Sequence, residues 1–100
     1  MEKHTPHCKL GKAKALVEAG KVNATRSARE GAMLVGIHDL EGMCEVVMSL
    51  AQVDFYKSMT THANHCIWQD VYRGSTVDGT PLYIKLTVID DVPIVSFKEL

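Results

Sequence analysis

The chain lacks the features that define several large protein classes. It has three cysteines in 100 residues, with no Cys-x-x-Cys spacing. An odd number of cysteines without that spacing does not indicate a disulfide framework and favours a reducing compartment. No apolar run approaches the roughly 18 residues that a membrane span needs, and the first residues lack the apolar core of a secretion signal. These absences predict a cytoplasmic protein with no membrane segment.

Several enzyme signatures are missing as well. The sequence has no Walker-type phosphate loop, no dinucleotide-binding fingerprint and no serine-nucleophile motif. It also has no internal repeat and no low-complexity tract. A chain of this size buries about 60 to 65 per cent of its unfolded surface and is too small for two cores. We therefore expect a single domain over residues 1–100.

The net charge of −1 hides an uneven distribution. Residues 1–29 contain seven Lys or Arg and two acidic residues, whereas residues 30–54 contain five acidic residues and no Lys or Arg. A basic end beside an acidic middle suggests one surface that attracts phosphate and another that repels it or meets a basic partner. The simpler interpretation is a pair of solvated helix faces, and charge alone favours it.

The first half of the sequence predicts three helices. Apolar residues at helical spacing begin the first at about Leu10, and Gly20 is placed to end it. The second is expected to start after Ser27, because Ser27 and the glutamate three residues later have the capping-box spacing, and to end at Gly36. The third is expected from about Asp39, where a further apolar stripe begins.

The second half predicts an antiparallel sheet. Four runs have the length and alternation of strands, at residues 54–61, 67–73, 82–89 and 92–98. Helices followed by strands, without βαβ alternation, predict an α+β fold with N-terminal helices packed on one face of an antiparallel sheet.

The last two runs have a register that can be derived. Only Asp90 and Asp91 separate them, and a two-residue loop predicts a tight hairpin. Counting back from this turn pairs Tyr83 with Lys98 and places Lys85 on the same face. Directly opposed residues have Cβ atoms about 5 Å apart, so the phenol and the ammonium can interact. The other face carries the apolar residues of both strands and is the predicted core face.

The first two runs have a less regular pattern. A five-residue loop at residues 62–66 would join them, and pairing Thr61 with Ile67 places Lys57 and Gln69 on one face. Strand interiors disfavour lysine, so polar residues at such positions in four strands suggest a working surface. The alternative is the polar outer face of a sheet that is covered on one side only, which is common.

Two further patterns allow a functional or a structural interpretation. His-x-x-His-Cys occurs at residues 4–8 and again at residues 62–66, and two such clusters could converge on zinc. The spacing is not that of a standard zinc finger, so coincidence in two surface loops is favoured. Trp68 and Tyr72 could stack on nucleic-acid bases, but packing under the helices is favoured.

Several runs of this sequence match those of a known family, and the matches extend almost from end to end. The matching runs are Thr5-Pro6-His7, Thr25-Arg26-Ser27-Ala28, Gly42-Met43-Cys44, DFYKSMTT, IWQDVYR and IVSFKE. The chain resembles the MqsR toxins, the endoribonucleases of a bacterial toxin–antitoxin system, whose fold is similar to RelE and YoeB. It departs from the family pattern at residues 29–40 and 74–81. The resemblance implies a catalytic set of Lys57, Gln69, Tyr83 and Lys98, and we expect Arg73 and Lys85 to contact RNA.

The resemblance also implies an activity. The chain would cleave messenger RNA at GCU-type sites, independently of the ribosome and of any metal or cofactor, by attack of the ribose 2′-OH on the adjacent phosphate. That reaction needs acid–base catalysis and stabilisation of charge on the phosphate. We expect Tyr83 and Lys57 to share the proton transfers, Lys57 and Lys98 to hold phosphate, and Gln69 to donate a hydrogen bond.

A partner is implied as well. The resemblance predicts an MqsA-type antitoxin that binds zinc and DNA, so operator DNA would be reached only through the antitoxin. Zinc would then belong to the partner. The alternatives are a non-catalytic RNA-binding or DNA-binding module and a zinc-binding regulatory module.

Overall fold

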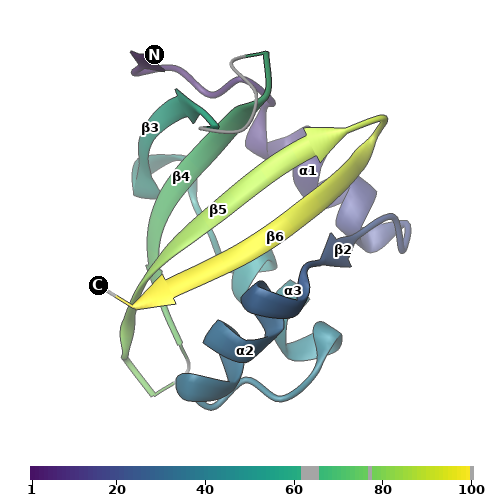
Figure 1. Ribbon diagram of the computed structural model, residues 1–100, viewed down its shortest axis with the longest axis vertical. Helices are drawn as coiled ribbons and strands as arrows, with labels where there is room; N and C mark the ends of the chain where they lie inside the picture. Colours follow the sequence, from purple (N-terminus) through teal and green to yellow (C-terminus); the bar gives the residue numbers. More distant parts are fainter. Residues whose placement is uncertain (62–65, 77, 100) are drawn as a thin grey trace.

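The computed structural model describes residues 1–61, 66–76 and 78–99, and within them it has three α-helices and one six-stranded sheet (Figure 1). The helices are α1 (Leu10–Glu18), α2 (Arg26–Leu34) and α3 (Leu40–Met48). The strands are β1 (Glu2–Lys3), β2 (Asn23–Ala24), β3 (Phe55–Thr60), β4 (Trp68–Ser75), β5 (Pro81–Ile89) and β6 (Val92–Glu99). The predicted α+β fold is confirmed.

The helices begin and end where local signals place them, with one exception. Gly20 and Gly36 follow α1 and α2 with φ of +81° and +86°, a conformation that glycine adopts without strain. The third helix begins where it was expected, at about Asp39, whose side chain caps α3 by accepting a hydrogen bond from Gly42 N. The prediction that Ser27 caps α2 was wrong, because Thr25 has the extended backbone of a cap residue and its hydroxyl accepts a hydrogen bond from Ala28 N at 3.1 Å.

The sheet has the order β1-β3-β4-β5-β6-β2, and only the short β2 pairs in parallel, with β6. Helices α1 and α3 lie behind the sheet in Figure 1, and α2 lies beside the C-terminal half of β6. The largest buried side chains of the core come from both layers: Tyr72, Met43, Leu82, Ile84, Val47 and Val95. None of the helices in the described part of the chain is long and apolar enough to cross a membrane.

The β5–β6 hairpin has the predicted register. Asp90 and Asp91 both have positive φ, at +51° and +61°, which is the backbone of the tight turn that suits the twist of two paired strands. Tyr83 lies opposite Lys98. Because the turn contains only two residues, no other register is available to the strands.

The β3–β4 pair also has the predicted register, with one irregularity. Thr61 N donates to Ile67 O at 3.0 Å, and Lys57 lies opposite Val71. The register shifts between Phe55 and Lys57, so the residue between them is an extra residue in β3. The prediction of a loop falls partly on residues 62–65, which lie outside the described residues.

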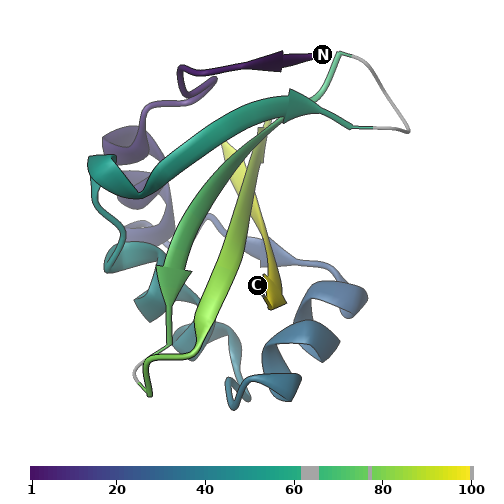
Figure 2. The same ribbon diagram turned by 90° about the vertical axis from the view of Figure 1, so that its left-hand side faces the viewer.

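The N-terminal strand β1 was not predicted. It pairs antiparallel with β3, with Glu2 opposite Met59, and runs along that strand in Figure 2. The segment after β1 is fixed to β4 by the buried Asp70, whose two carboxylate oxygens accept hydrogen bonds from His7 N and Cys8 N, each at 2.9 Å. The N-terminus is therefore held beside β3 by long-range contacts, which no local sequence pattern predicts.

Candidate active site

One face of the sheet carries all the side chains that the sequence predicted for the site. Side chains alternate between the faces of a strand, and paired residues share a face. The observed registers therefore place six residues on the side away from the core, which we call the open face. They are Lys57 of β3, Gln69 and Arg73 of β4, Tyr83 and Lys85 of β5, and Lys98 of β6.

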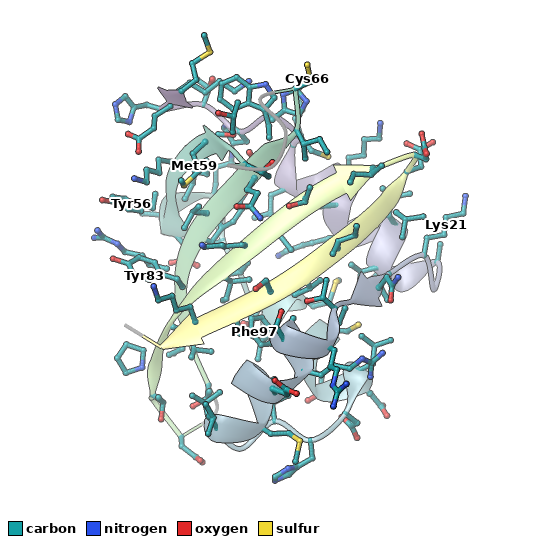
Figure 3. The ribbon with its side chains drawn as sticks, viewed as in Figure 1. Lys21, Tyr56, Met59, Cys66, Tyr83 and Phe97 are labelled. Atoms are coloured by element: carbon teal, nitrogen blue, oxygen red, sulfur yellow. The ribbon has the colours of Figure 1, made fainter. Side chains whose placement is uncertain are left out.

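The centre of the open face is an aromatic and cationic cluster. Tyr56 and Tyr83 stack with ring centroids 6.0 Å apart and an interplanar angle of 25°. The Arg73 guanidinium lies 3.9 Å from the Tyr56 ring centroid and 5.9 Å from that of Tyr83. Both contacts are cation–π interactions, which hold Arg73 beside the predicted catalytic tyrosine. Figure 3 shows Tyr56 and Tyr83 projecting from the same side of the sheet.

Tyr56 is a site residue that the sequence analysis missed. Simple alternation from Ser58 and Thr60, which are buried, assigns Tyr56 to the core face. The structure leaves it 41% exposed because the extra residue in β3 turns its side chain outward. Bulges are common beside active sites, but this one has no glycine or proline to mark it in the sequence.

Lys57 lies in an ion pair with Glu2. Its Nζ lies 2.6 Å from Glu2 Oε1, and the two side chains are 24% and 53% exposed. This hydrogen bond, with the charges of Glu2, Tyr56 and Tyr83, raises the pKa of Lys57 above its ordinary value, although partial burial opposes the shift. The contact with Glu2 therefore favours the ammonium form of Lys57.

The remaining predicted residues extend the cluster along the sheet. Gln69 lies opposite Met59, one pair away from Lys57, and Lys98 lies opposite Tyr83. Lys85 lies opposite Val71, in the middle of the face. The strands are about 4.8 Å apart, so these side chains place several cations on one face of a protein whose net charge is −1. Such a surface attracts phosphate groups.

Trp68 and Tyr72 are both engaged in contacts within the protein. The Tyr72 ring is 1% exposed and makes an edge contact with Phe55, so it cannot stack on a base. Trp68 packs against the N-terminal segment and not under the helices. His7 stacks on its ring at 5.8 Å, and Lys3 Nζ lies 4.3 Å from its centroid.

The two His-Cys clusters give no metal site in the part of the chain that the structure describes. Across residues 1–61, 66–76 and 78–99, no three His, Cys, Asp or Glu residues are grouped so that they could hold a metal ion. His7 of the first cluster is stacked on Trp68. His62 and His65 of the second cluster lie outside the described residues.

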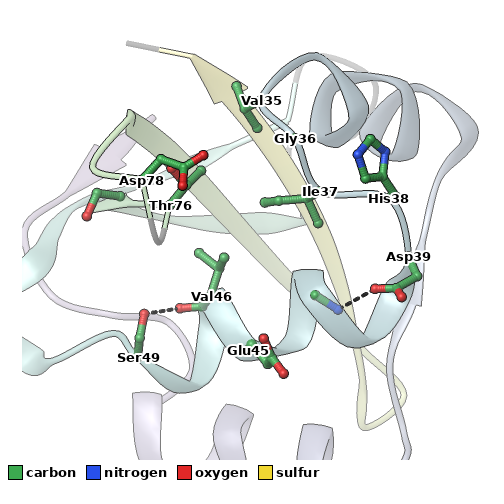
Figure 4. Close-up of a pocket in the computed structure, with 12 residues that line it drawn as sticks. Val35, Gly36, Ile37, His38, Asp39, Glu45, Val46, Ser49, Thr76 and Asp78 are labelled. Carbon is green, nitrogen blue, oxygen red and sulfur yellow. Dashed lines mark hydrogen bonds between the residues drawn. The ribbon is translucent and has the colours of Figure 1, made fainter.

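A cavity of about 540 Å³ lies away from the open face, against α3 and the segment that precedes it (Figure 4). Its lining includes the carboxylates of Asp39, Glu45 and Asp78 and none of the predicted site residues. Asp39 already accepts a hydrogen bond from Gly42 N at 2.7 Å as the cap of α3. The acidic lining disfavours a polyanion, so we do not assign RNA to this cavity.

Two comparisons with known proteins find a similar family and a similar protein. Residues 5–99 match the sequence model of the family described as "Motility quorum-sensing regulator, toxin of MqsA". The chain is also similar to the mRNA interferase toxin MqsR of Escherichia coli (strain K12), with 57% identity over 99 residues that cover 99% of each protein. The similarity therefore spans every strand that contributes to the open face.

Proposed function

The chain belongs to the MqsR toxin family, and on that premise we propose that it is the toxin of a toxin–antitoxin pair and cleaves messenger RNA on the open face. The observation that carries the proposal is the placement of Lys57, Tyr83 and Lys98 on that one face by three successive strand registers. A polar outer face without a function would not need an ion-paired lysine and a tyrosine stacked beside an arginine.

The reaction is transesterification without a metal ion. The ribose 2′-OH attacks the adjacent phosphorus in line, the 5′-oxygen departs, and the products are a 2′,3′-cyclic phosphate and a 5′-hydroxyl. The protein must accept the proton of the 2′-OH, stabilise the charge on the phosphorane and protonate the leaving oxygen. These are positioning and proton-transfer tasks that side chains alone can perform.

The residues divide these tasks according to their surroundings. Lys57 is held as an ammonium by Glu2 and serves as a phosphate clamp, with Lys98 as a second clamp across from Tyr83. Tyr83 transfers a proton. Gln69 donates a hydrogen bond to a phosphate oxygen or a base edge, and Arg73 and Lys85 contact further phosphates.

The finer assignments rest on the family. We propose that the chain prefers GCU-type sites, acts without the ribosome in the cytoplasm, and is neutralised by an MqsA-type antitoxin that binds zinc and DNA. An unrestrained ribonuclease would destroy the messages of its own cell, which is the physical reason to expect an inhibitor. Contact with operator DNA would be indirect, through the antitoxin.

Cleavage of a defined RNA tests the proposal. The purified chain is incubated in EDTA with an oligonucleotide that contains one GCU, and we expect a single cut that leaves a 2′,3′-cyclic phosphate. The matched control is the same oligonucleotide with a 2′-deoxyribose at the cut site, which must stay intact. Salt-sensitive binding without cleavage would instead indicate the non-catalytic nucleic-acid-binding module, and activity that returns only with added metal would refute the metal-free mechanism.

A further inference from the structure

Glu2 brings a carboxylate to the open face. Its pairing with Met59 places its side chain on the same face as Lys57, two residues earlier in β3, and its Oε1 ends 2.6 Å from Lys57 Nζ. Backbone contacts on both sides hold it there: Thr60 N donates to Met1 O at 3.0 Å, and Asp70 fixes the segment that follows. The backbone that carries this carboxylate is thus positioned by the fold.

The proposed reaction lacks a proton acceptor among the residues assigned so far. Lysine and tyrosine have ordinary pKa values near 10 and are both protonated at neutral pH. The contact with Glu2 raises the pKa of Lys57 further. A carboxylate is ionised at neutral pH and can take a proton at once. Asp70, the acidic residue of β4, is buried on the core side and hydrogen-bonded to the backbone.

We propose that Glu2 is the general base of the ribonuclease reaction and that Tyr83 is the general acid, an inference that rests on the proposed function. The Glu2 carboxylate takes the proton of the 2′-OH as the 2′-oxygen bonds to phosphorus. The bond from phosphorus to the 5′-oxygen breaks, and the Tyr83 hydroxyl gives its proton to that oxygen. Exchange with water then returns Glu2 to the carboxylate and Tyr83 to the phenol.

Lys57 would bring the substrate phosphate close to Glu2. A phosphate oxygen bound to Lys57 lies at a hydrogen-bonding distance of about 2.8 Å from Nζ. The carboxylate lies 2.6 Å from the same nitrogen. The 2′-oxygen that attacks this phosphate is therefore delivered beside the carboxylate. In the sheet order, Tyr83 of β5 lies two strands from Lys57 and three from Glu2, on the same open face, so RNA that crosses this face runs from the base towards the acid.

Binding of RNA also adjusts the basicity of Glu2. In the free protein the hydrogen bond and charge of Lys57, with the charges of the Met1 ammonium and His4, lower the pKa of Glu2, although partial burial opposes them. A bound phosphate shares the Lys57 ammonium and adds negative charge beside the carboxylate, and both effects raise a carboxyl pKa. Glu2 thus becomes a better proton acceptor when substrate is present.

The variant Glu2→Gln tests the proposal, because it keeps the side-chain length and an oxygen acceptor for Lys57 but cannot accept the proton. We expect its single-turnover rate at saturating RNA to fall by about 10²- to 10⁴-fold, with RNA binding retained. The matched control is Asp91→Asn, which also removes one negative charge, at an exposed ion pair with Lys12 at 3.6 Å. That control should cleave at the wild-type rate.

A second substrate separates base from acid. When the 5′-oxygen at the cut site is replaced by sulfur, the leaving group needs no protonation. Tyr83→Phe should then recover most of its rate, whereas Glu2→Gln should stay slow. The wild-type rate should also decline on the acid side as Glu2 becomes protonated, and Glu2→Gln should lack this decline.

Three results would overturn the inference. If Glu2→Gln cleaved at the wild-type rate and bound RNA more tightly, Glu2 would only compete with the RNA phosphate for Lys57. Recovery of Glu2→Gln on the sulfur substrate would make Glu2 the acid. If the wild-type protein cleaved neither substrate, the proposed function itself would be wrong, and the inference would fail with it.

Discussion

Lys57 and Tyr83 have similar ordinary pKa values, near 10, but lie in different surroundings. Lys57 contacts a carboxylate, whereas Tyr83 stacks on Tyr56 beside a guanidinium. A lysine that is stabilised as an ammonium suits electrostatic stabilisation, and the phenol remains for proton transfer. The two residues are therefore not interchangeable, although the sequence offers no means to distinguish them.

Removing the Tyr83 hydroxyl tests its role. Tyr83→Phe keeps the ring that stacks on Tyr56, so folding and RNA affinity should change little. The single-turnover rate on an all-oxygen GCU oligonucleotide should fall by about 10²- to 10⁴-fold, the range for general acid–base groups. The matched control is Tyr72→Phe. The Tyr72 hydroxyl is buried and has no hydrogen-bond partner within the described residues, so its loss should leave the rate unchanged and the melting temperature equal or higher.

A folded Tyr83→Phe protein that cleaves at the wild-type rate would exclude Tyr83 from proton transfer.

Burial, with the charge of Asp70, raises the pKa of Tyr72 to about 12. The control hydroxyl thus stays neutral throughout the pH range of the assay.

The sequence could predict that Tyr83 lies opposite Lys98, because a two-residue turn determines that register, and that Lys57 shares a face with Gln69, because side chains alternate along a strand. It could not predict Tyr56 or Glu2. Tyr56 depends on a bulge, and Glu2 depends on a two-residue strand that pairs with residues more than fifty positions away. Long-range pairing of so short a strand leaves no periodic signal.

At the scale of the element, turns and caps decided which predictions succeeded. The β5–β6 register was predictable because the loop is too short to allow a slip. The start of α2 was not, because Thr25 and Ser27 both have the chemistry of a cap and only the backbone distinguishes them. The two-residue strand β2, which precedes α2 and pairs with β6, has no sequence signal either.

The packing of α2 against β6 gives a prediction about Gly31. A Cβ at this position would lie 2.9 Å from the carbonyl oxygen of Phe97, a backbone atom that cannot move without disturbing β6. Alanine favours a helix interior over glycine by about 1 kcal/mol. We nevertheless expect Gly31→Ala to lower the free energy of unfolding, since the clash separates α2 from the sheet.

Gly11 in α1 is the matched control for that substitution. A Cβ there would meet no atom within 4 Å, so Gly11→Ala should raise the free energy of unfolding by up to about 1 kcal/mol. Urea unfolding of both variants measures the difference. If Gly31→Ala were as stabilising as Gly11→Ala, the close approach of α2 and β6 would be refuted.

At the scale of the whole molecule, the charges of the sequence separate by position in the fold. The first helix is basic in sequence, but it packs behind the sheet, and Lys12 pairs with Asp91 at the hairpin turn. The open face has its own cations from β3 to β6. RNA binding should therefore depend on the sheet lysines and not on the basic N-terminal third, for which the sequence already favoured solvated helix faces over a phosphate-binding surface.

This separation predicts different salt dependences for two lysine variants. Each phosphate contact with single-stranded nucleic acid contributes about 0.7 to the slope of log K against log salt concentration. Lys98→Ala removes an exposed cation across from Tyr83 and should reduce the magnitude of the slope by about that amount. Lys12→Ala removes the same charge from the far side of the sheet and should leave the slope unchanged. Fluorescence anisotropy of a labelled 2′-deoxy GCU oligonucleotide, titrated at several salt concentrations, measures both without cleavage. Equal decreases in the two variants would mean that RNA follows the overall charge of the protein and that the open face is not its binding site.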